Sequence, residues 1–455
     1  MKNEIGFVLA LAVAGTVYAK VSVSKYSVTF DEPVTAELAD GALAQFNGDA
    51  SRATLNLSNC TDEGLAEAMR KFAAFGKLYV TKSPELTSIA PLKASKFTSI
   101  ELKDMPKVAD ITPLSGCSAL TSLKLSQVGF AHADLSFCSG CPAVASFSLS
   151  GAPSTFKSLT GLEKLTALKI FELSNVRGPV DLSALSSFKN MRRLSLRYVD
   201  GIDLSPLCGM DMLEDLSLYG SRNLDLAQLS GCKRLKRIQI YATKLILDYG
   251  ALAGITSLET VDAGLSEMHD LSWAPKLPNL KTLSLFAENY NSYAPLGKCK
   301  KLSSLTCWNM RNDVDIAQFA EDMAANGAIR QLSFADSYIK NENKLAALSG
   351  CGLKKLNLGS VNAKNKKTER SVDLAFLEAL APSLTELRFG KILAENFTAV
   401  GKCVKLTSLD ASCQRGFDFE AVKNLPELRS LTVPKARKQE CEEALKDRKL
   451  TVYGD

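Results

Sequence analysis

The sequence predicts an α/β fold built as a solenoid, in which a short strand and a return segment recur along most of the chain. Each copy has an aliphatic residue, a second one three positions later and a third two positions after that, as in LEDLSL at residues 213–218. The third aliphatic residue, which we call the marker, recurs mostly every 22 to 24 residues. A regular period in this range indicates stacked structural repeats.

The markers define about 17 repeats. They are Leu57, Val80, Leu102, Leu125, Leu149, Leu173, Leu196, Leu218, Ile240, Ala263, Leu285, Cys307, Phe334, Leu358, Phe389, Ala411 and Val433. One unit alone cannot bury its aliphatic residues, so neighbouring units must stack to form a core. We therefore expect a curved parallel sheet on a concave face, with short helical, 3₁₀ and irregular returns on the convex face.

The return segments differ in length and in pattern. In the first repeat, residues 62–75 place Leu65, Met69 and Phe72 at helical spacing, which predicts a helix there. Other returns are short and carry an Asp at one recurring position, which predicts a turn in which the carboxylate accepts a backbone hydrogen bond. These residues are Asp134, Asp181, Asp203, Asp225 and Asp373.

The period resembles that of leucine-rich repeats. Returns such as DLSPL at residues 203–207 resemble bacterial internalin-like repeats, and the LSGC and GKC segments resemble the cysteine-containing repeats of bacterial surface adhesins. The resemblance implies a bacterial, cell-surface or secreted binding protein. The Asn usual three positions after the marker is replaced here, so its ladder of backbone hydrogen bonds should be partial or absent. The replacements include Cys60, Ser221, Thr243, Ser266 and Ser337.

The two ends lack the repeat. Residues 1–19 carry Lys2, an apolar run and the small-residue pattern Val17-Tyr18-Ala19, which predicts a secretory signal and export to the periplasm, cell surface or medium. No later run approaches about 20 apolar residues, so no transmembrane segment is predicted. We expect an N-terminal cap over 20–50, leucine-rich repeats over 51–433 and a C-terminal cap, a helix plus a strand, over 434–455.

Six of the twelve cysteines recur at nearly one position of the return. Periodic placement predicts buried thiols that pack as small hydrophobic groups, although two in adjacent repeats are also candidates for a disulfide. The CxxC of Cys138 and Cys141 has no second pair, so no metal site is predicted. The six are Cys117, Cys141, Cys232, Cys299, Cys351 and Cys403.

The residues point away from catalysis and from nucleic acid. The chain has two histidines, His132 and His269, and no recognised nucleophile, metal or phosphate-binding motif, so neither an enzyme nor a cofactor is predicted. A formal net charge of +6 is too small to indicate a nucleic-acid partner. The basic cluster at residues 364–370 is typical of a solvated loop.

The candidate binding residues come from strand geometry. Side chains alternate along a strand, so the residue after each marker should point out of the concave face. At this position the middle repeats carry Arg197, Tyr219, Tyr241, Phe286 and Trp308, and Gly264 should leave a gap for a protruding group. Three further residues, Arg193, Tyr198 and Arg237, should share or border this face.

Exposed aromatic and arginine side chains are typical of binding hot spots. The sequence therefore predicts an exported protein that recognises a protein partner through its concave face. The alternatives are a glycan ligand, a self-associating structural surface protein, or aromatic rings that only pack on one another across strands. The oligomeric state does not follow from the sequence.

Overall fold

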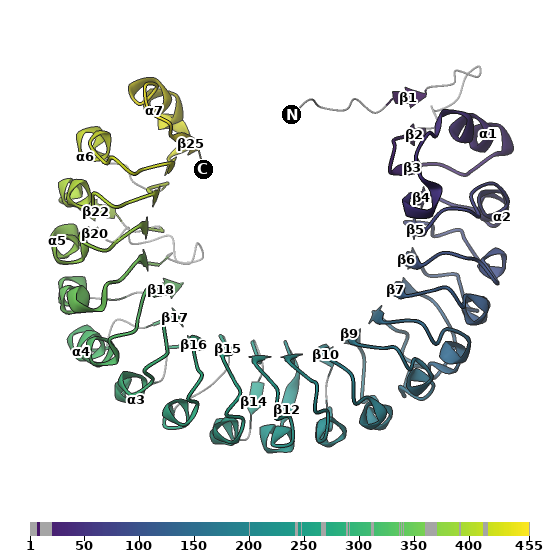
Figure 1. Cartoon of the computed structure of the whole chain (residues 1–455), viewed down its shortest axis with the longest axis horizontal. Coiled ribbons are helices and arrows are strands. Elements are labelled where there is room, and N and C mark those ends of the chain that lie inside the picture. The colour runs from purple at the N-terminus through teal and green to yellow at the C-terminus, as the bar shows by residue number, and fades with distance from the viewer. Residues whose placement is uncertain are drawn as a thin grey trace. The chain divides into compact units, whose positions relative to one another are not determined.

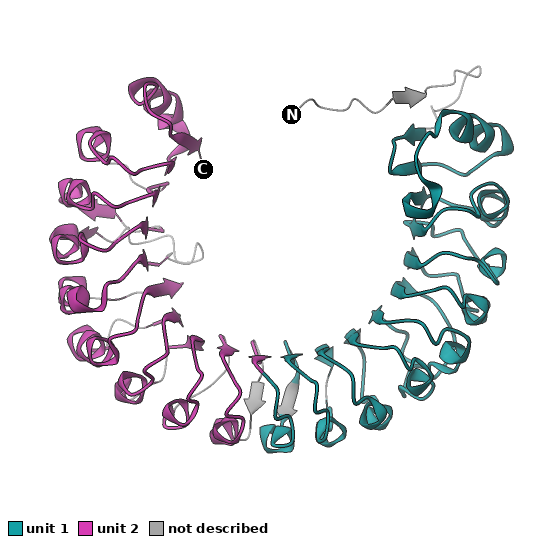
Figure 2. Ribbon diagram, in the orientation of Figure 1, with its two compact units in different colours: residues 1–235 teal, residues 236–455 magenta. Residues whose placement is uncertain are grey.

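A computed structural model gives the arrangement of the chain. It describes residues 7–9, 21–199, 201–241, 244–246, 248–264, 270–287, 290, 292–310, 314–335, 337, 339, 341–359, 371–390, 393–412 and 417–454. The chain divides into two compact units, Met1–Leu235 and Lys236–Asp455 (Figure 1, Figure 2). In each unit the strands stack along the inner side of a curved row, and the helical segments lie along its outer side (Figure 2).

Unit 1 starts with an antiparallel pair, β2 and β3, and continues as parallel strands from β3 to β11. The strands are β1 (Phe7–Leu9), β2 (Val21–Val23), β3 (Ser27–Phe30), β4 (Thr54–Ser58), β5 (Lys77–Thr81), β6 (Ser99–Met105), β7 (Ser122–Val128), β8 (Ser146–Ser150), β9 (Ile170–Val176), β10 (Arg193–Val199), β11 (Asp215–Ser217) and β12 (Arg222–Leu224). The helices are α1 (Ala36–Gln45) and α2 (Asp62–Lys71). Helix α2 lies where the spacing of apolar residues predicts a helix.

The other returns of unit 1 are 3₁₀ segments. They are η1 (Ala50–Arg52), η2 (Ala90–Leu92), η3 (Thr112–Gly116), η4 (Ser136–Gly140), η5 (Leu162–Lys164), η6 (Ser183–Ser187), η7 (Ser205–Leu207) and η8 (Leu226–Leu229). A 3₁₀ turn rises about 2.0 Å per residue and suits short connections, which is why these returns fit within a 22–24-residue repeat.

Unit 2 repeats the same plan. Its strands are β13 (Arg237–Gln239), β14 (Lys244–Ile246), β15 (Thr260–Ala263), β16 (Thr282–Phe286), β17 (Ser304–Trp308), β18 (Gln331–Ala335), β19 (Lys355–Asn357), β20 (Ser371–Asp373), β21 (Glu386–Arg388), β22 (Leu393–Glu395), β23 (Ser408–Asp410), β24 (Ser430–Val433) and β25 (Thr451–Gly454). Its helical returns are α3 (Ala294–Gly297), α4 (Ile316–Asn326), α5 (Leu377–Leu380), α6 (Phe419–Lys423), α7 (Lys438–Ala444), η9 (Tyr249–Gly254), η10 (Ala274–Lys276), η11 (Glu342–Cys351), η12 (Leu374–Phe376), η13 (Phe397–Lys402) and η14 (Lys435–Arg437).

The strand register confirms the predicted repeat. Markers pair with markers across parallel strands, for example Leu149 with Leu173 and Leu173 with Leu196 in unit 1. In unit 2, Leu285 pairs with Cys307. Marker side chains are buried throughout, so stacking of the repeats forms an apolar layer behind the strands of each unit.

The recurring Asp residues form the predicted turns. In each, the Asp Oδ1 accepts a hydrogen bond from the backbone N–H two residues later, as between Asp203 and Ser205 at 2.9 Å. The Ser205 hydroxyl also donates to Asp203, and this side-chain hydrogen bond is the main cause of the lowered pKa of that carboxyl. The same backbone bond occurs at Asp134, Asp181, Asp225 and Asp373.

Serine hydroxyls form a partial replacement for the missing Asn ladder. The buried Ser221 and Ser337 donate to the marker carbonyls of the preceding repeats, Leu196 at 3.2 Å and Cys307 at 3.1 Å. Ser83, also buried, accepts from the backbone N–H of Cys60. The expectation of a partial ladder is confirmed at these positions.

The six recurring cysteines are buried free thiols, as predicted. The Cys117 and Cys141 thiols donate to the carbonyls of Leu92 and Leu114 in the preceding return, at 3.2 and 2.9 Å. Each such contact joins one repeat to the one before it. Burial raises the pKa of the thiols of Cys141, Cys232 and Cys299 to about 11, and that of Cys403 to about 12.

These raised pKa values predict a loss of stability at alkaline pH. A thiol of an unfolded chain ionises near pH 8.5, whereas the folded thiol stays protonated, so stability is complete below about pH 8.5 and falls as pH rises toward 11. The slope is at most about 1.4 kcal/mol per pH unit for each thiol. Urea midpoints measured from pH 8 to 11 should fall, and a Cys141→Ala/Cys232→Ala variant should show a flatter fall. An equal slope in both proteins would contradict the assignment.

A second recurring feature is a left-handed backbone residue two positions after the marker. In unit 1 it occupies consecutive repeats from β4 to β11, with φ between 48° and 69°, at Asn59, Lys82, Asp104, Gln127, Gly151, Asn175, Tyr198 and Gly220. This conformation costs most L residues about 1–2 kcal/mol and Asn and Asp less, whereas Gly, which has no Cβ, adopts it freely. The turn it makes directs the chain out of each strand into its return.

Several sequence predictions concern residues outside the described part of the chain. One is the predicted signal at 1–19, of which the structure describes only β1. The others are Thr243, Ser266, His269 and the basic cluster at 364–370. Among the described residues, no helix has the length and apolar character needed to cross a membrane.

Candidate functional site

The predicted binding residues divide between the two units. Arg193, Arg197 and Tyr198 lie on β10 and Tyr219 follows β11, all in unit 1. In unit 2, Arg237 lies on β13, Tyr241 follows it, and Phe286 and Trp308 end β16 and β17. The structure brings Arg197, Tyr198 and Tyr219 into contact in unit 1 and Tyr241 and Trp308 into contact in unit 2, whereas Arg193 and Arg237 lie apart from these rings.

In unit 1, Arg197, Tyr198 and Tyr219 form a stack, which we call the unit-1 cluster. The Arg197 guanidinium lies 4.9 Å from the centre of the Tyr219 ring, and the Tyr198 ring meets Tyr219 edge-on at 5.1 Å. Tyr198 also covers Gly220, where a Cβ would lie 2.5 Å from the Tyr198 Cδ1 atom. Gly220 therefore makes room for an aromatic ring that remains 48% exposed.

The two other predicted arginines, Arg193 and Arg237, are the first residues of β10 and β13. Arg193 is exposed and forms an ion pair with Asp215 of the neighbouring strand, with 3.3 Å between Nη2 and Oδ2. Arg237 is also exposed and pairs in register with Thr260. An exposed ion pair adds less than about 1 kcal/mol to stability, so Arg193 is readily available to exchange Asp215 for a ligand.

In unit 2, Tyr241 and Trp308 close over Gly264, and we call them the unit-2 aromatic pair. Their ring centres are 5.9 Å apart at an interplanar angle of 77°, and the Trp308 Nε1 donates to the Ser284 hydroxyl at 2.9 Å. A Cβ on Gly264 would lie 2.9 Å from Tyr241 and 3.0 Å from Trp308.

The predicted gap at Gly264 is therefore wrong. The Trp308 side chain reaches across β16 to β15, and together with Tyr241 it fills the space that the missing side chain leaves. Both rings stay partly exposed, as does Phe286, which is the register partner of Trp308. The result is a fixed aromatic surface rather than a hole.

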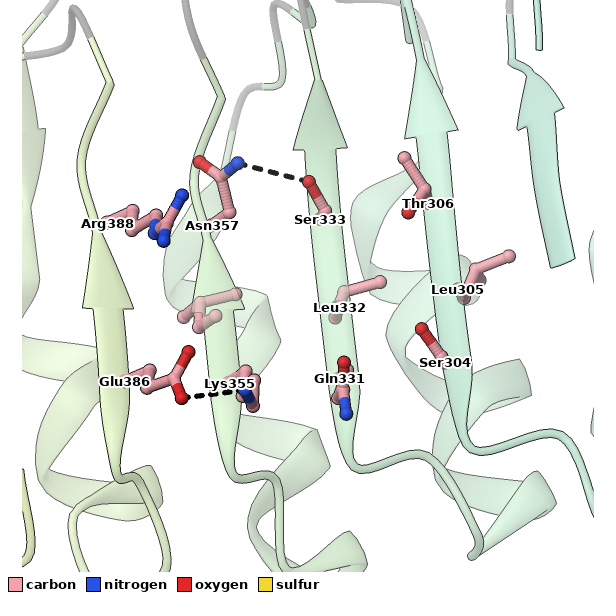
Figure 3. Close-up of a pocket in the computed structure, with 11 residues that line it drawn as sticks. Ser304, Leu305, Thr306, Gln331, Leu332, Ser333, Lys355, Asn357, Glu386 and Arg388 are labelled. Carbon is pink, nitrogen blue, oxygen red and sulfur yellow. Dashed lines mark hydrogen bonds and ion pairs between the residues drawn. The ribbon is translucent and has the colours of Figure 1, made fainter. Parts of the chain in front are cut away.

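A polar hollow of about 180 Å³ lies on the outward face of β17, the strand that Trp308 ends, and of β18, β19 and β21 (Figure 3). Lys355 is paired with Glu386 at 2.6 Å, and the Asn357 side-chain amide donates to Ser333 at 3.1 Å. The exposed Arg388 guanidinium points toward Asn357 (Figure 3). Hydroxyl, amide and guanidinium groups thus lie together, and the remaining lining includes Ser304, Thr306 and Gln331.

Sequence reasoning missed this hollow because, apart from Arg193, Tyr198 and Arg237, it read only the residue after each marker. The residues one and three positions before the marker also point outward, and they supply Thr306, Ser333, Asn357 and Arg388 as well as Gln331 and Lys355. Reading all three positions in register places Trp308 next to the polar residues of the hollow.

The chemistry of the unit-1 cluster, the unit-2 aromatic pair and the polar hollow suits binding. Together they present aromatic faces, amides, hydroxyls and guanidinium groups, and none of the three places a nucleophile beside a general base. Within the described residues, no group of three or more His, Cys, Asp or Glu side chains is arranged to hold a metal ion.

No protein-family model and no curated protein sequence matches the chain. Several solved structures do match it. A leucine-rich-repeat protein of Leptospira interrogans is 14% identical, covers 87% of this chain and 95% of its own, and has a TM-score of 0.54. The internalin InlF of Listeria monocytogenes is 20% identical over 81% of this chain and 94% of its own, with a TM-score of 0.49.

The functional domain of InlJ from Listeria monocytogenes, which includes a cysteine ladder, is 14% identical over 82% of this chain and 71% of its own, with a TM-score of 0.45. Sequence identities this low are evidence about the fold alone. The parallel strands in marker-to-marker register, the short helical returns and the Leptospira likeness agree with one another. The chain therefore has the leucine-rich-repeat fold.

Proposed function

We propose that the chain is an exported binding protein that recognises a protein partner through the outward face of its strands. The unit-2 aromatic pair carries this proposal. Two large rings are held partly exposed on a sheet by mutual contact, by the hydrogen bond from Trp308 to Ser284 and by the close fit to Gly264. Rings fixed before binding lose little conformational entropy when a partner covers them.

The packing of the rings on one another does not remove their capacity to bind. An edge-on aromatic contact is worth about 0.5–1.5 kcal/mol, less than the 2 kcal/mol or more that a central aromatic residue contributes to a protein interface. The neighbouring hollow supports the same proposal because Arg388 forms no ion pair among the described residues, and Arg is enriched in interfaces.

A glycan is the second candidate ligand. Hydroxyl and amide groups line the hollow beside Trp308, with Ser304, Thr306 and Asn357 among them, and such groups suit hydrogen bonds to sugar hydroxyls. Protease treatment of the extract before capture separates the two, because it destroys a protein partner and leaves a glycan intact.

The test compares capture from a surface extract of the native host. A Tyr241→Ser/Trp308→Ser variant should weaken the affinity for the captured partner at least tenfold, since each ring contributes to the centre of the interface. The control is Tyr26→Ser/Tyr453→Ser, which removes two tyrosines that are 68% and 53% exposed but lie outside both clusters. Unchanged affinity in the first variant would show that the partner binds elsewhere.

Export is the other part of the proposal, and it rests on the signal-like residues 1–19. N-terminal sequencing of the protein recovered from its native host should read Lys20 as the first residue. A mature chain that still begins with Met1 would contradict export through this signal.

A further inference from the structure

Three neighbouring segments of unit 2, which lead into β17, β18 and β19, carry positive charge without a carboxylate among them. Residues 297–306, 326–335 and 351–359 contain six basic side chains and no Asp or Glu. One of the six, Lys355, is paired with Glu386. The other five are exposed, and we call them the basic edge: Lys298, Lys300, Lys301, Arg330 and Lys354.

Backbone hydrogen bonds place these segments side by side. The N–H of Arg330 donates to the carbonyl of Ser303 at 2.8 Å, and the N–H of Lys354 donates to the carbonyl of Arg330 at 2.7 Å. In unit 1 the equivalent residues, directly before β5 to β8, are all uncharged: Gly76, Thr98, Thr121 and Ala145. The positive charge is therefore a property of this edge and not of the repeat.

Two cations of the basic edge are held by carbonyl groups where α4 ends. The Lys300 Nζ donates to the carbonyl of Ala325 at 2.7 Å. The Arg330 Nη1 donates to the carbonyl of Gly327 at 3.1 Å and also to that of Cys351 in the next return. The last carbonyls of a helix lack partners within it and carry partial negative charge. A carbonyl is not ionised, so both cations are fixed in place and keep their net charge.

The remaining lysines of the basic edge are Lys298, Lys301 and Lys354. Lys301 donates to the side-chain oxygen of Asn279 at 2.7 Å, and among the described residues none of the three forms an ion pair. Like charges gathered in this way repel one another. An anionic ligand that bridges them removes this repulsion, so the basic edge suits a partner with several negative charges.

The basic edge adjoins the polar hollow. Gln331 and Lys355, which line the hollow at the start of their strands, directly follow Arg330 and Lys354 in the chain (Figure 3). A ligand that extends from the edge onto the strands therefore meets cations first and then hydroxyl and amide groups. This order of groups suits a polymer that carries both anionic groups and hydroxyls.

We propose that the basic edge binds an acidic polysaccharide, whose sulfate or carboxylate groups pair with its cations while sugar hydroxyls reach the hollow. Such anionic groups accept charge-assisted hydrogen bonds from Lys and Arg. The three segments, all of which the structure describes, expose no aromatic ring on which nucleic-acid bases could stack. They also expose no large apolar side chain that could enter a membrane.

The test measures binding of the full chain to heparin, uncharged dextran, polyadenylate and polyglutamate at an ionic strength of about 0.15 M. Wild-type protein should bind heparin more tightly than the other two polyanions and should not bind dextran. Lys298→Gln/Lys301→Gln/Lys354→Gln should weaken heparin binding at least about tenfold and flatten its dependence on salt, because fewer counterions are released. Its unfolding temperature should equal that of wild type, and the corresponding triple Arg variant should bind heparin like wild type.

A matched control removes the same charge from unit 1. Lys93→Gln/Lys96→Gln/Lys164→Gln replaces three exposed lysines and should leave heparin binding unchanged. Equal weakening in both triple Gln variants would overturn the proposal, as would no binding of heparin, or binding of polyadenylate or polyglutamate at least as tight as that of heparin. The Tyr241→Ser/Trp308→Ser variant should bind heparin like wild type, so failure of this proposal is distinguishable from failure of the proposed function.

Discussion

Replacing Gly140 with alanine should lower the stability of the protein by about 3 kcal/mol. Gly140 ends η4, and a Cβ added to it would lie 1.6 Å from the carbonyl oxygen of Ser115 in η3. The obstacle is backbone, which cannot rotate away as a side chain does. Adjacent repeats must move apart, and overpacking of this kind costs about 1–3 kcal/mol or more.

Gly254 provides the matched control because it ends η9 in the same way. No heavy atom beyond its immediate neighbours lies within 4 Å of the Cβ that alanine would add there. Gly254→Ala should therefore be neutral or stabilising by up to about 1 kcal/mol. The measurement is the urea midpoint of both variants, and equal midpoints would mean that the returns are not in backbone contact.

The two tryptophans should respond very differently to truncation. Trp273 is 1% exposed, and its Nε1 donates to the Asp270 carbonyl at 3.0 Å. Trp273→Ala should cost about 3–5 kcal/mol, because it leaves a cavity the size of an indole in the core. Trp308→Ala should cost less, about 1–3 kcal/mol, since it removes the edge-on contact with Tyr241 and the hydrogen bond to Ser284 from a ring that is already partly exposed.

Thermal unfolding followed by circular dichroism measures both effects. Trp273→Phe serves as the conservative control and should lose less than the alanine variant. If Trp308→Ala destabilised the protein as much as Trp273→Ala, then Trp308 would belong to the core, and its place in a binding surface would be wrong.

The fold was predictable because its main determinant is periodic. Inward leucines every 22 to 24 residues set the register, and marker pairs such as Leu149 and Leu173 confirm it. The left-handed residues were not predictable in the same way. Their position is fixed by backbone geometry, and side chains as unlike as Lys82, Gln127 and Tyr198 occupy it.

The sequence predicted which residues of the candidate site point outward, but it did not predict how their side chains pack. Alternation along the strands identified Tyr241 and Trp308 as outward, and both are partly exposed. What Gly264 does depends on the reach of an indole across β16, and residue spacing carries no information about that reach. The polar hollow at Arg388 required reading two further outward positions across four strands in register.

Trp308 allows the most direct test of the central claim, that a partner covers the outward face of unit 2. The chain has two tryptophans, so Trp273→Phe leaves Trp308 as the only source of indole emission. Addition of the captured partner should shift this emission and protect it from quenching by iodide, with the same midpoint as binding. A partner that binds fully while Trp308 stays equally accessible to iodide would contradict the claim.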